Sequence, residues 1–383
     1  MENKWEMLES SNEEREKIWK KNRTFAGDVW FRFRHKPTAI AGLVIILLLL
    51  VFALAGPMFT DYSYSKQNLE VVNIPPLMKV FCAPDEDGYL YITQSLKVVW
   101  VNRDGTLGTQ LKKVREDSAS SMTIFDCNGK EVGLYYGKKP YVLADPNTRV
   151  LYSTEKIWNK SYILGTDSLG RDILTRLMYG TRVSLMVAFV AVLVNMIIGI
   201  IFGGISGYAG GMVDTVMMRI VDIISTIPLT LYVILIMVIM GSGLKSIIVA
   251  LGTVYWVDMA RVVRGQVLSL KGQEFVLAAR TIGSSTKSIL MQHLIPNAMG
   301  SILVTVTMLI PSAIFMEAFL GFLGIGLQPP LASLGTMCND ATENLRSCPH
   351  QLFIPALVIC LIMFAFNFVG DGLRDALDPK LKK

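Results

Sequence analysis

The stretch TAIAGLVIILLLLVFALAGPM, residues 38–58, contains no charged residue and decides the class of fold. A transmembrane helix needs roughly 20 consecutive apolar residues to cross the hydrocarbon core of a bilayer. The composition of the whole chain agrees, because 52% of its 383 residues are hydrophobic and 18% are charged. A soluble domain carries about a quarter charged residues. The sequence therefore predicts a polytopic membrane protein.

The run at 38–58 also has features of a cleavable secretory signal, namely a basic flank and an Ala-Leu-Ala tripeptide at 53–55. A signal core is shorter, roughly 7–15 residues, and here 37 residues precede the run. We therefore expect an uncleaved first helix at 38–59. Five more apolar runs predict an all-α protein with six transmembrane helices, the others at 183–202, 220–240, 247–263, 298–320 and 353–369.

Basic residues gather in three segments outside these runs, which are the N-terminal segment 1–37, the loop 264–297 and the tail 371–383. The loop between the last two runs has one basic residue, Arg346. Since basic loops stay in the cytoplasm, we expect a multi-pass protein with both termini cytoplasmic and its apolar surface in contact with membrane lipid. The net charge of +6 follows from these loops and requires no nucleic-acid partner.

Residues 60–164 differ from the rest of the chain in composition. Short β-branched and aromatic runs, YLYITQ, LKVVWV and EVGLYYG, alternate with the turn signals NRDG and DCNGK. Asn-Gly and Asp-Gly tolerate the positive φ that tight hairpin turns require. We therefore predict an extracytoplasmic β-rich domain inserted between the first and second transmembrane helices.

Cysteines occur in the regions that we expect outside the membrane. Cys82 and Cys127 lie in the inserted domain, and Cys338 and Cys348 lie in the loop before the last span. An oxidising compartment allows two disulfides, and pairing within each region is the simplest arrangement. Four unpaired thiols in a reducing habitat are the alternative.

Residues 165–182 lead from the inserted domain into the second span. Leu169, Ile173 and Leu177 recur every four residues, while charged side chains occupy other faces. This periodicity predicts a short amphipathic helix lying at the outer membrane interface. A helix packed against the bundle fits the same pattern.

The sequence contains no pattern typical of a catalytic site, a metal site or a nucleotide loop, so we expect no cofactor in this chain. Ionisable residues are scarce within the apolar runs. Asp222, Asp258 and Glu317 fall near predicted span ends, where water or headgroups reach them. Ion-coupled carriers hold such groups near the midplane, so uphill transport would require energy from a partner.

The loop EFVLAARTIGSSTKSILMQHLIPN, residues 274–297, is polar and basic between two apolar runs. As a helix it places an apolar stripe on one face, formed by Phe275, Ala278, Ala279 and Ile282. Gly283 is expected to end this helix, and Ser284 or Ser285 to cap a second one that begins near Thr286 and stops at Pro296. Such a hairpin suits docking into a groove on another protein, and a helix resting on lipid headgroups is the alternative.

The motif LAARTIG…HLIP in this loop resembles the EAA loop of ABC importer permeases. It matches at Ala278, Ala279, Gly283 and Pro296, and its departures, Leu277 and His293, are those of the peptide-importer branch. Further segments resemble the second, C-type, permease of dipeptide and oligopeptide systems, namely GTDSLGRDILTRLMYGTRVSL, GYAGGMVDTVMMRIVD, EAFLGFLGIGLQPP and FNFVGDGLRDALDP. The resemblance covers roughly 30–60 and 160–380. Leu334 stands where the family usually has Trp, and the insertion is longer than usual.

The resemblance implies a type I ABC importer permease fold in a bacterial cell membrane, with a five-helix core at 183–370 and a cytoplasmic coupling loop at 264–297. It also implies as partners a homologous second permease, two ATP-binding cassette ATPases that bind ATP and Mg, and an extracytoplasmic peptide-binding lipoprotein. The loop would transmit ATPase motion through Glu274, Phe275, Ala278, Ala279, Arg280, Gly283 and Pro296. Nickel or another small solute is the alternative cargo. A membrane receptor with an extracellular sensor is the non-transport alternative.

Overall fold

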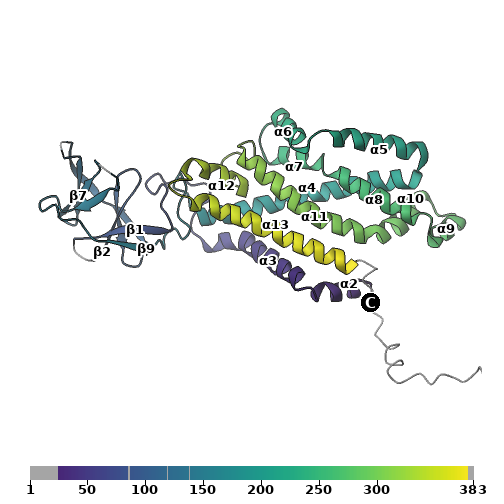
Figure 1. The fold of residues 1–383 in the computed structure, drawn as a ribbon, viewed down its shortest axis with the longest axis horizontal. Helices are drawn as coiled ribbons and strands as arrows, with labels where there is room; N and C mark the ends of the chain where they lie inside the picture. The colour runs from purple at the N-terminus through teal and green to yellow at the C-terminus, as the bar shows by residue number, and fades with distance from the viewer. Residues whose placement is uncertain (1–24, 85–86, 119, 138, 378–383) are drawn as a thin grey trace, which may run out of the picture.

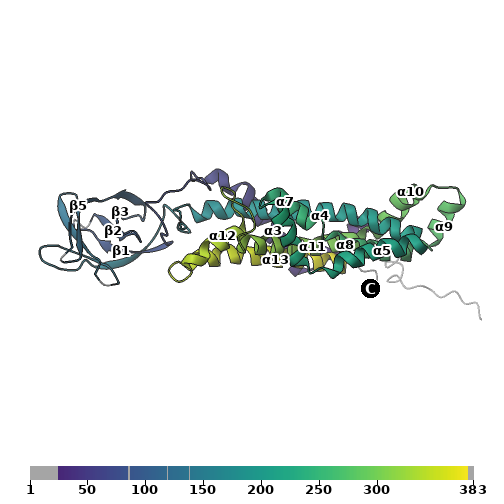
Figure 2. The same cartoon turned by 90° about the horizontal axis from the view of Figure 1, so that it is seen from above.

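The computed structural model describes residues 25–84, 87–118, 120–137 and 139–377. The molecule is elongated, with a β domain (residues 77–158) at one end of a helical bundle (Figure 1). At the opposite end of the bundle, α9 and α10 project beyond the other helices (Figure 2). Most of the predicted N-terminal segment 1–37 and part of the predicted tail 371–383 lie outside the described residues.

Five helical stretches of the described chain are long and apolar enough to cross a membrane. They are α3 (Pro37–Leu54), α4 (Ile173–Ala209), Leu244–Leu270, Thr286–Phe322 and α13 (His350–Leu377). The stretch Leu244–Leu270 comprises α7 (Leu244–Gly252) and α8 (Trp256–Leu270). The stretch Thr286–Phe322 comprises α10 (Thr286–Ser288), the π-helical turns Ile289–Leu294 and α11 (Ile295–Phe322). Shorter elements lie at the ends of the bundle. They are the helices α2 (Phe25–Arg34) and α12 (Leu334–Ala341) and the 3₁₀ turns Gly56–Phe59 and Thr342–Asn344.

The span predicted at 220–240 is broken in the structure. Helices α5 (Gly211–Thr226) and α6 (Leu229–Met240) are bent by 84° relative to one another. Pro228 stands immediately before α6, and a residue preceding proline avoids the helical conformation. Of the six predicted transmembrane helices, five are continuous in the described chain, and the sixth is present if the bent pair counts as one crossing.

Helix α4 is continuous over 37 residues, a length of about 55 Å at 1.5 Å per residue. This exceeds the roughly 30 Å hydrocarbon core of a bilayer. The separate interfacial helix predicted at 165–182 is therefore corrected, because its helical part is the first turns of α4. Asp172 caps these turns and accepts hydrogen bonds from the backbone N–H of Thr175, at 2.8 Å, and from its hydroxyl.

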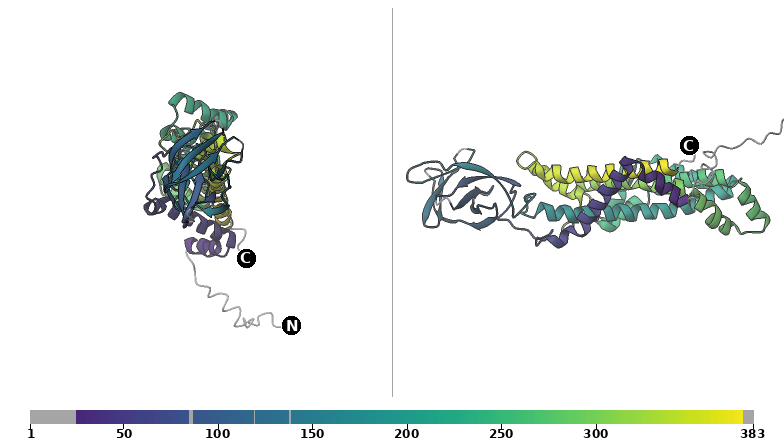
Figure 3. Two further views of the ribbon diagram at one scale, coloured as in Figure 1. Left: turned by 90° about the vertical axis from the view of Figure 1, so that its left-hand side faces the viewer. Right: turned by 90° about the horizontal axis from the view of Figure 1, so that it is seen from below.

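Glycines on α4 allow it to pack closely against α8. A Cβ atom on Gly203 would lie 2.3 Å from the carbonyl oxygen of Ala260, and one on Gly199 would lie 2.4 Å from the side chain of Met259. Gly207 meets Arg264 and Val267 in the same way. Small residues at four-residue spacing are typical of contacts between membrane helices. Helix α3 lies along the outside of the bundle beside α13 (Figure 3).

The β domain contains two antiparallel sheets with the strand orders β4-β3-β2-β1-β9 and β5-β6-β7-β8. The first sheet is built from β1 (Leu77–Cys82), β2 (Gly88–Ile92), β3 (Val98–Asn102), β4 (Leu107–Gln110) and β9 (Thr154–Trp158). The second is built from β5 (Lys112–Asp117), β6 (Met122–Cys127), β7 (Lys130–Tyr135) and β8 (Val142–Ala144). Leu90 of the first sheet and Phe125 of the second belong to one buried cluster. The β-rich insertion is therefore present, and its core lies between the sheets.

The predicted hairpin turn in DCNGK is present between β6 and β7. Cys127 pairs with Lys130, and the two residues between them, Asn128 and Gly129, have φ of 54° and 85°. Both central residues of a type I′ turn need positive φ. Local turn chemistry therefore specifies this hairpin.

The structure shows no disulfide among the cysteines of the described chain. Cys82 lies in β1 of the first sheet, whereas Cys127 lies in β6 of the second. The sulfur of Cys348 lies 3.7 Å from Gln94 Nε2 and 3.8 Å from the carbonyl oxygen of Asn73. Cys348 therefore packs against the base of the β domain, and neither predicted bridge is formed.

Candidate functional site

The coupling segment, defined as residues 264–297, contains α9 (Glu274–Thr281) at the bundle end opposite the β domain. Gly283 ends this helix at φ 80°. Its N–H donates to the carbonyl of Arg280, and the N–H of Ser284 donates to that of Ala279, both at 3.0 Å. These bonds form a Schellman motif, in which a left-handed glycine satisfies the last carbonyls of a helix. The prediction that Gly283 ends this helix is therefore confirmed.

The two sides of α9 have different surroundings. Val276 and Ala279 are buried against the protein, with 0% and 4% of their surface exposed. Phe275 and Ile282 are 39% and 82% exposed, and Ala278 is exposed between them. The predicted apolar stripe is thus divided, because Ala279 belongs to the inner side. What remains outside is an apolar strip without a partner among the described residues.

The two charged residues of α9 that the sequence predicted as coupling residues, Glu274 and Arg280, lie near its ends. Glu274 occupies the first turn and is exposed, where a carboxylate interacts favourably with the helix dipole. The guanidinium of Arg280 lies 5.2 Å from the centre of the Tyr208 ring at the end of α4. This cation–π contact joins α9 to the bundle.

The base of the coupling segment is held to α4 and α5. Arg264 donates two hydrogen bonds to the carboxylate of Asp214, at 2.5 and 2.6 Å. Lys271 Nζ donates to the carbonyl oxygen of Gly207 at 3.0 Å. Bidentate Arg–carboxylate pairs combine strength with fixed geometry. The segment is thus anchored where it leaves α8.

The second half of the coupling segment runs directly into the bundle. Ser285 caps α10 by accepting from the N–H of Ser288 at 3.3 Å, as predicted. Pro296 does not stop the helix, and this expectation is corrected. The proline stands in the first turn of α11, directly after the π-helical turns, and the wider turns accommodate a residue that has no N–H to donate. The helix that begins at α10 therefore continues into α11 without an intervening loop.

A buried charge cluster connects the opposite end of the bundle to the β domain. Asp167 accepts hydrogen bonds from Arg171 Nε, at 2.7 Å, and from Arg176. Both arginines also donate to Asp340 on α12, each at 3.0 Å. The arginine side chains are 6% and 4% exposed. Asp167 and both arginines are therefore buried and compensate one another, and the partly exposed Asp340 supplies the second negative charge.

Hydrogen bonds next to this cluster tie the β domain to α13. Gln351 Nε2 donates to Asn73 Oδ1 and to the carbonyl oxygen of Thr166, both at 2.8 Å. Asn73 Nδ2 donates to Gln94 Oε1 at 2.8 Å. Burial raises the pKa of the neighbouring Cys348 thiol. The charge cluster and these hydrogen bonds together join the linkers of the β domain to α4, α12 and α13.

Glu317 on α11 is fully buried, which corrects the expectation that water reaches it. Its Oε2 accepts from the hydroxyl of Ser184 at 2.6 Å, and its Oε1 has no hydrogen-bond partner within the described chain. Close beside it, a Cβ atom on Gly335 would lie 2.3 Å from the carbonyl oxygen of Ala318. The hydrogen bond of Glu317 therefore joins α11 to α4, and the close approach at Gly335 holds α12 against α11.

Sequence reasoning assigned no role to the charge cluster or to Glu317. The signal was present in the quoted motifs GTDSLGRDILTRLMYGTRVSL and EAFLGFLGIGLQPP, which contain Asp167, Arg171, Arg176 and Glu317. The sequence did not indicate that Asp340 of α12 is the partner of these arginines, because Arg171 and Asp340 are 169 positions apart. Pairing over that distance depends on helix packing.

The sequence is similar to those of known transport proteins. Residues 199–383 match the binding-protein-dependent transport system inner membrane component, and residues 24–76 match the N-terminal TM domain of oligopeptide transport permease C. The oligopeptide transport system permease protein OppC of Bacillus subtilis (strain 168) is 40% identical over 368 residues, 96% of this chain and 94% of that protein. The chain belongs to the oligopeptide and dipeptide permease family.

Further relatives and a solved structure are also similar to this permease. The dipeptide transport system permease protein DppC of B. subtilis is 37% identical over 381 residues, 99% of this chain and 93% of that protein. OppC of Escherichia coli (strain K12) is 43% identical over 236 residues, 62% of this chain and 78% of that protein. A solved structure of the methionine transporter MetNI, inward facing, aligns with 53% of this permease and 96% of that chain, at a TM-score of 0.44 and 20% identity.

Membership confirms the resemblance seen in the sequence. The protein is an integral membrane permease of a binding-protein-dependent importer and not an enzyme, because ATP hydrolysis in such importers occurs in partner ATPases. The family works in complexes with a second permease, ATPases and a binding protein.

Proposed function

We propose that this permease is the second, C-type, subunit of an ATP-driven importer of di- and oligopeptides in a bacterial cell membrane. It forms the translocation path together with a homologous permease. Two ATP-binding cassette ATPases bind ATP and Mg, and an extracytoplasmic lipoprotein delivers the peptide. The observation that carries this proposal is the near full-length similarity to OppC and DppC of B. subtilis.

The proposed orientation places the coupling segment and both termini in the cytoplasm and the β domain outside. Basic residues of the coupling segment support this orientation, and they are Arg264, Lys271, Arg280 and Lys287 against the single acid Glu274. The β domain lies at the opposite end of the bundle, more than one membrane thickness away along α4. In this orientation the β domain is available to the binding protein, and the coupling segment is available to the ATPases.

The proposed coupling site is the exposed side of α9. Phe275, Ala278 and Ile282 would enter a groove of an ATPase, with Glu274 and Arg280 at its rim and Gly283 fixing the approach. Because α10 continues into α11 through Pro296, closure of the ATPases would displace the bundle end of α11. Lipid covers the apolar surface that neither the second permease nor the ATPases cover.

Purification of the tagged chain from its own host in a gentle detergent tests the assembly. We expect a second permease, ATPases and a binding protein in the same complex by mass spectrometry. Recovery of the folded chain alone would favour the receptor alternative. Purified complexes in proteoliposomes then separate the cargoes: we expect ATP-dependent uptake of radiolabelled trialanine, whereas uptake of ⁶³Ni²⁺ without peptide uptake would assign the importer to nickel.

A further inference from the structure

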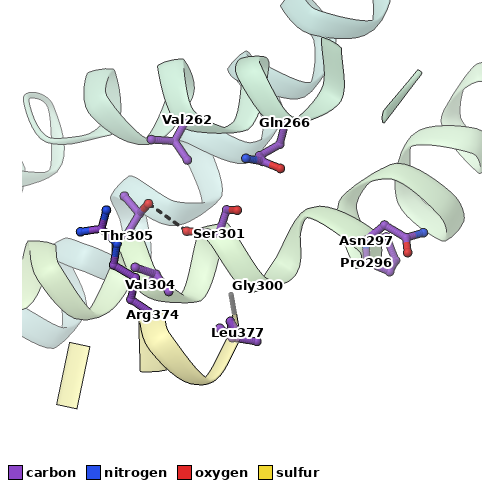
Figure 4. Close-up of a pocket in the computed structure, with 10 residues that line it drawn as sticks. All are labelled: Val262, Gln266, Pro296, Asn297, Gly300, Ser301, Val304, Thr305, Arg374 and Leu377. Carbon is purple, nitrogen blue, oxygen red and sulfur yellow. Dashed lines mark hydrogen bonds between the residues drawn. The ribbon is translucent and has the colours of Figure 1, made fainter. Parts of the chain in front are cut away.

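A cavity of about 640 Å³ opens between α8, α11 and α13, next to the coupling segment. This volume falls within the range of roughly 300–1,000 Å³ that is common for small-molecule sites. Figure 4 shows its walls, with α8 on one side, the beginning of α11 on another and the end of α13 on the third. Ten residues line it: Val262, Gln266, Pro296, Asn297, Gly300, Ser301, Val304, Thr305, Arg374 and Leu377.

The polar groups of the cavity come from separate helices. Asn297, Ser301 and Thr305 follow one another at four-residue spacing on α11, so they share one face of that helix. Gln266 reaches the cavity from α8. These side chains offer hydrogen-bond donors and acceptors of the kind that match peptide groups. Hydrogen bonds within the wall already engage Asn297 Nδ2, with the carbonyl of His293, and Thr305 Oγ1, with that of Ser301.

Arg374 is the single charged residue among the ten, and no acid pairs with it in the described chain. Two other cations at this end of the bundle pair with acids: Arg264 binds Asp214, and Lys36 binds Asp375, the neighbour of Arg374. A planar guanidinium binds a carboxylate bidentately. Among the described residues that line the cavity, the exposed Arg374 is thus the one charged group, and it favours a ligand that carries a negative group.

We propose that this cavity binds the carboxylate end of a short peptide as it leaves the translocation path. The assignment rests on the proposed function and adds the residue, Arg374, that receives the carboxylate. Pro296 and Asn297 belong both to the cavity and to the end of the coupling segment. Displacement of the beginning of α11 by the ATPases would thus change the shape of the cavity and release the peptide.

Equilibrium dialysis tests the site on the complete transporter in lipid nanodiscs, without the binding protein, using radiolabelled trialanine. We expect saturable binding, with trialanine amide competing at least tenfold more weakly than trialanine because the amide lacks the negative charge. R374Q should weaken binding about tenfold or more, as expected for a lost charge-assisted pair. R374K should retain more affinity than R374Q. R219Q is the matched control, because Arg219 is exposed on α5 and does not line the cavity.

Three results would overturn the inference: no saturable binding to the wild-type complex, equal competition by the amide, or unchanged binding to R374Q. Retention of an anionic phospholipid by wild type but not by R374Q, without trialanine binding, would instead assign the cavity to a lipid headgroup. Uptake by proteoliposomes with the binding protein is measured on the same preparations. Absence of uptake by wild type overturns the proposed function, whereas uptake without any effect of R374Q on dialysis overturns this site alone.

Discussion

The two ends of this permease are held together in different ways. At the β-domain end, Asp167, Arg171, Arg176 and Asp340 form a buried charge cluster, and Gln351 adds hydrogen bonds to both linkers of the β domain. At the coupling end, α9 buries two side chains and contacts α4 through the partly exposed Arg280. The β-domain end is therefore held by buried polar contacts, whereas the coupling end presents an exposed apolar surface.

This difference indicates that the two ends of the bundle have different roles. The charge cluster holds the second linker of the β domain to α4 and α12, and the hydrogen bonds of Gln351 hold both linkers to α13. A coupling helix with few buried contacts has low local stability and is free to adjust to a partner. Substitutions at the first end should therefore act on folding, and substitutions at the second on assembly and transport.

Arg176→Ala should have the largest effect on stability. It leaves the buried Asp167 with one arginine in place of two and also removes a partner of the partly exposed Asp340. Breaking a buried pair typically costs about 3–5 kcal/mol. We expect a clearly lower melting temperature of the purified chain. Arg115→Ala is the control, because its pair with Glu131 in the β domain is exposed and such pairs contribute about 0–1 kcal/mol. Equal shifts for the two variants would contradict a special role for the cluster.

Gly283→Val should abolish peptide uptake while leaving membrane insertion normal. A non-glycine residue in the left-handed region costs about 1–2 kcal/mol, so the Schellman end of α9 should open and reorient the helix. Gly272→Val serves as the comparison, since Gly272 lies in the turn before α9 and has open space around it. Wild-type uptake by Gly283→Val in proteoliposomes would refute the docking role of this turn.

Phe275→Ala and Val276→Ala probe the two sides of α9. Val276 is buried, and its truncation should lower stability by about 1–2 kcal/mol. Phe275→Ala should leave the melting temperature unchanged but reduce the amount of ATPase that co-purifies with the chain. If Phe275→Ala lowers stability and retains the ATPases, the exposed side of α9 is not the docking surface.

Arg280→Ala should lower stability by about 0.5–1 kcal/mol, the range for a cation–π contact at an exposed site and less than we expect for Arg176→Ala or Val276→Ala. A double-mutant cycle with Tyr208→Leu measures the contact directly. We expect the two substitutions together to destabilise less than the sum of their separate effects. Strict additivity would show that the ring and the guanidinium do not interact in solution.

Several features of the fold were predictable because they depend on neighbouring residues. Apolar runs located the long helices, the Asn128-Gly129 pair specified a hairpin, and Gly283 marked the end of α9. Errors arose where local patterns had more than one solution. The periodicity at 165–182 fitted a separate helix as well as the start of α4, and a proline at 296 fitted a helix end as well as a first turn.

The sequence by itself determined the membrane class, the β-rich insertion and the family, since hydropathy, turn chemistry and motifs are properties of consecutive residues. Tertiary structure alone decided that Asp340 completes the charge cluster, that Glu317 is buried, that Cys348 packs beside Gln94 and that Arg374 faces a cavity. Each of these depends on which helices become neighbours. That choice is made by the packing of whole helix surfaces, to which residues far apart in the chain contribute together.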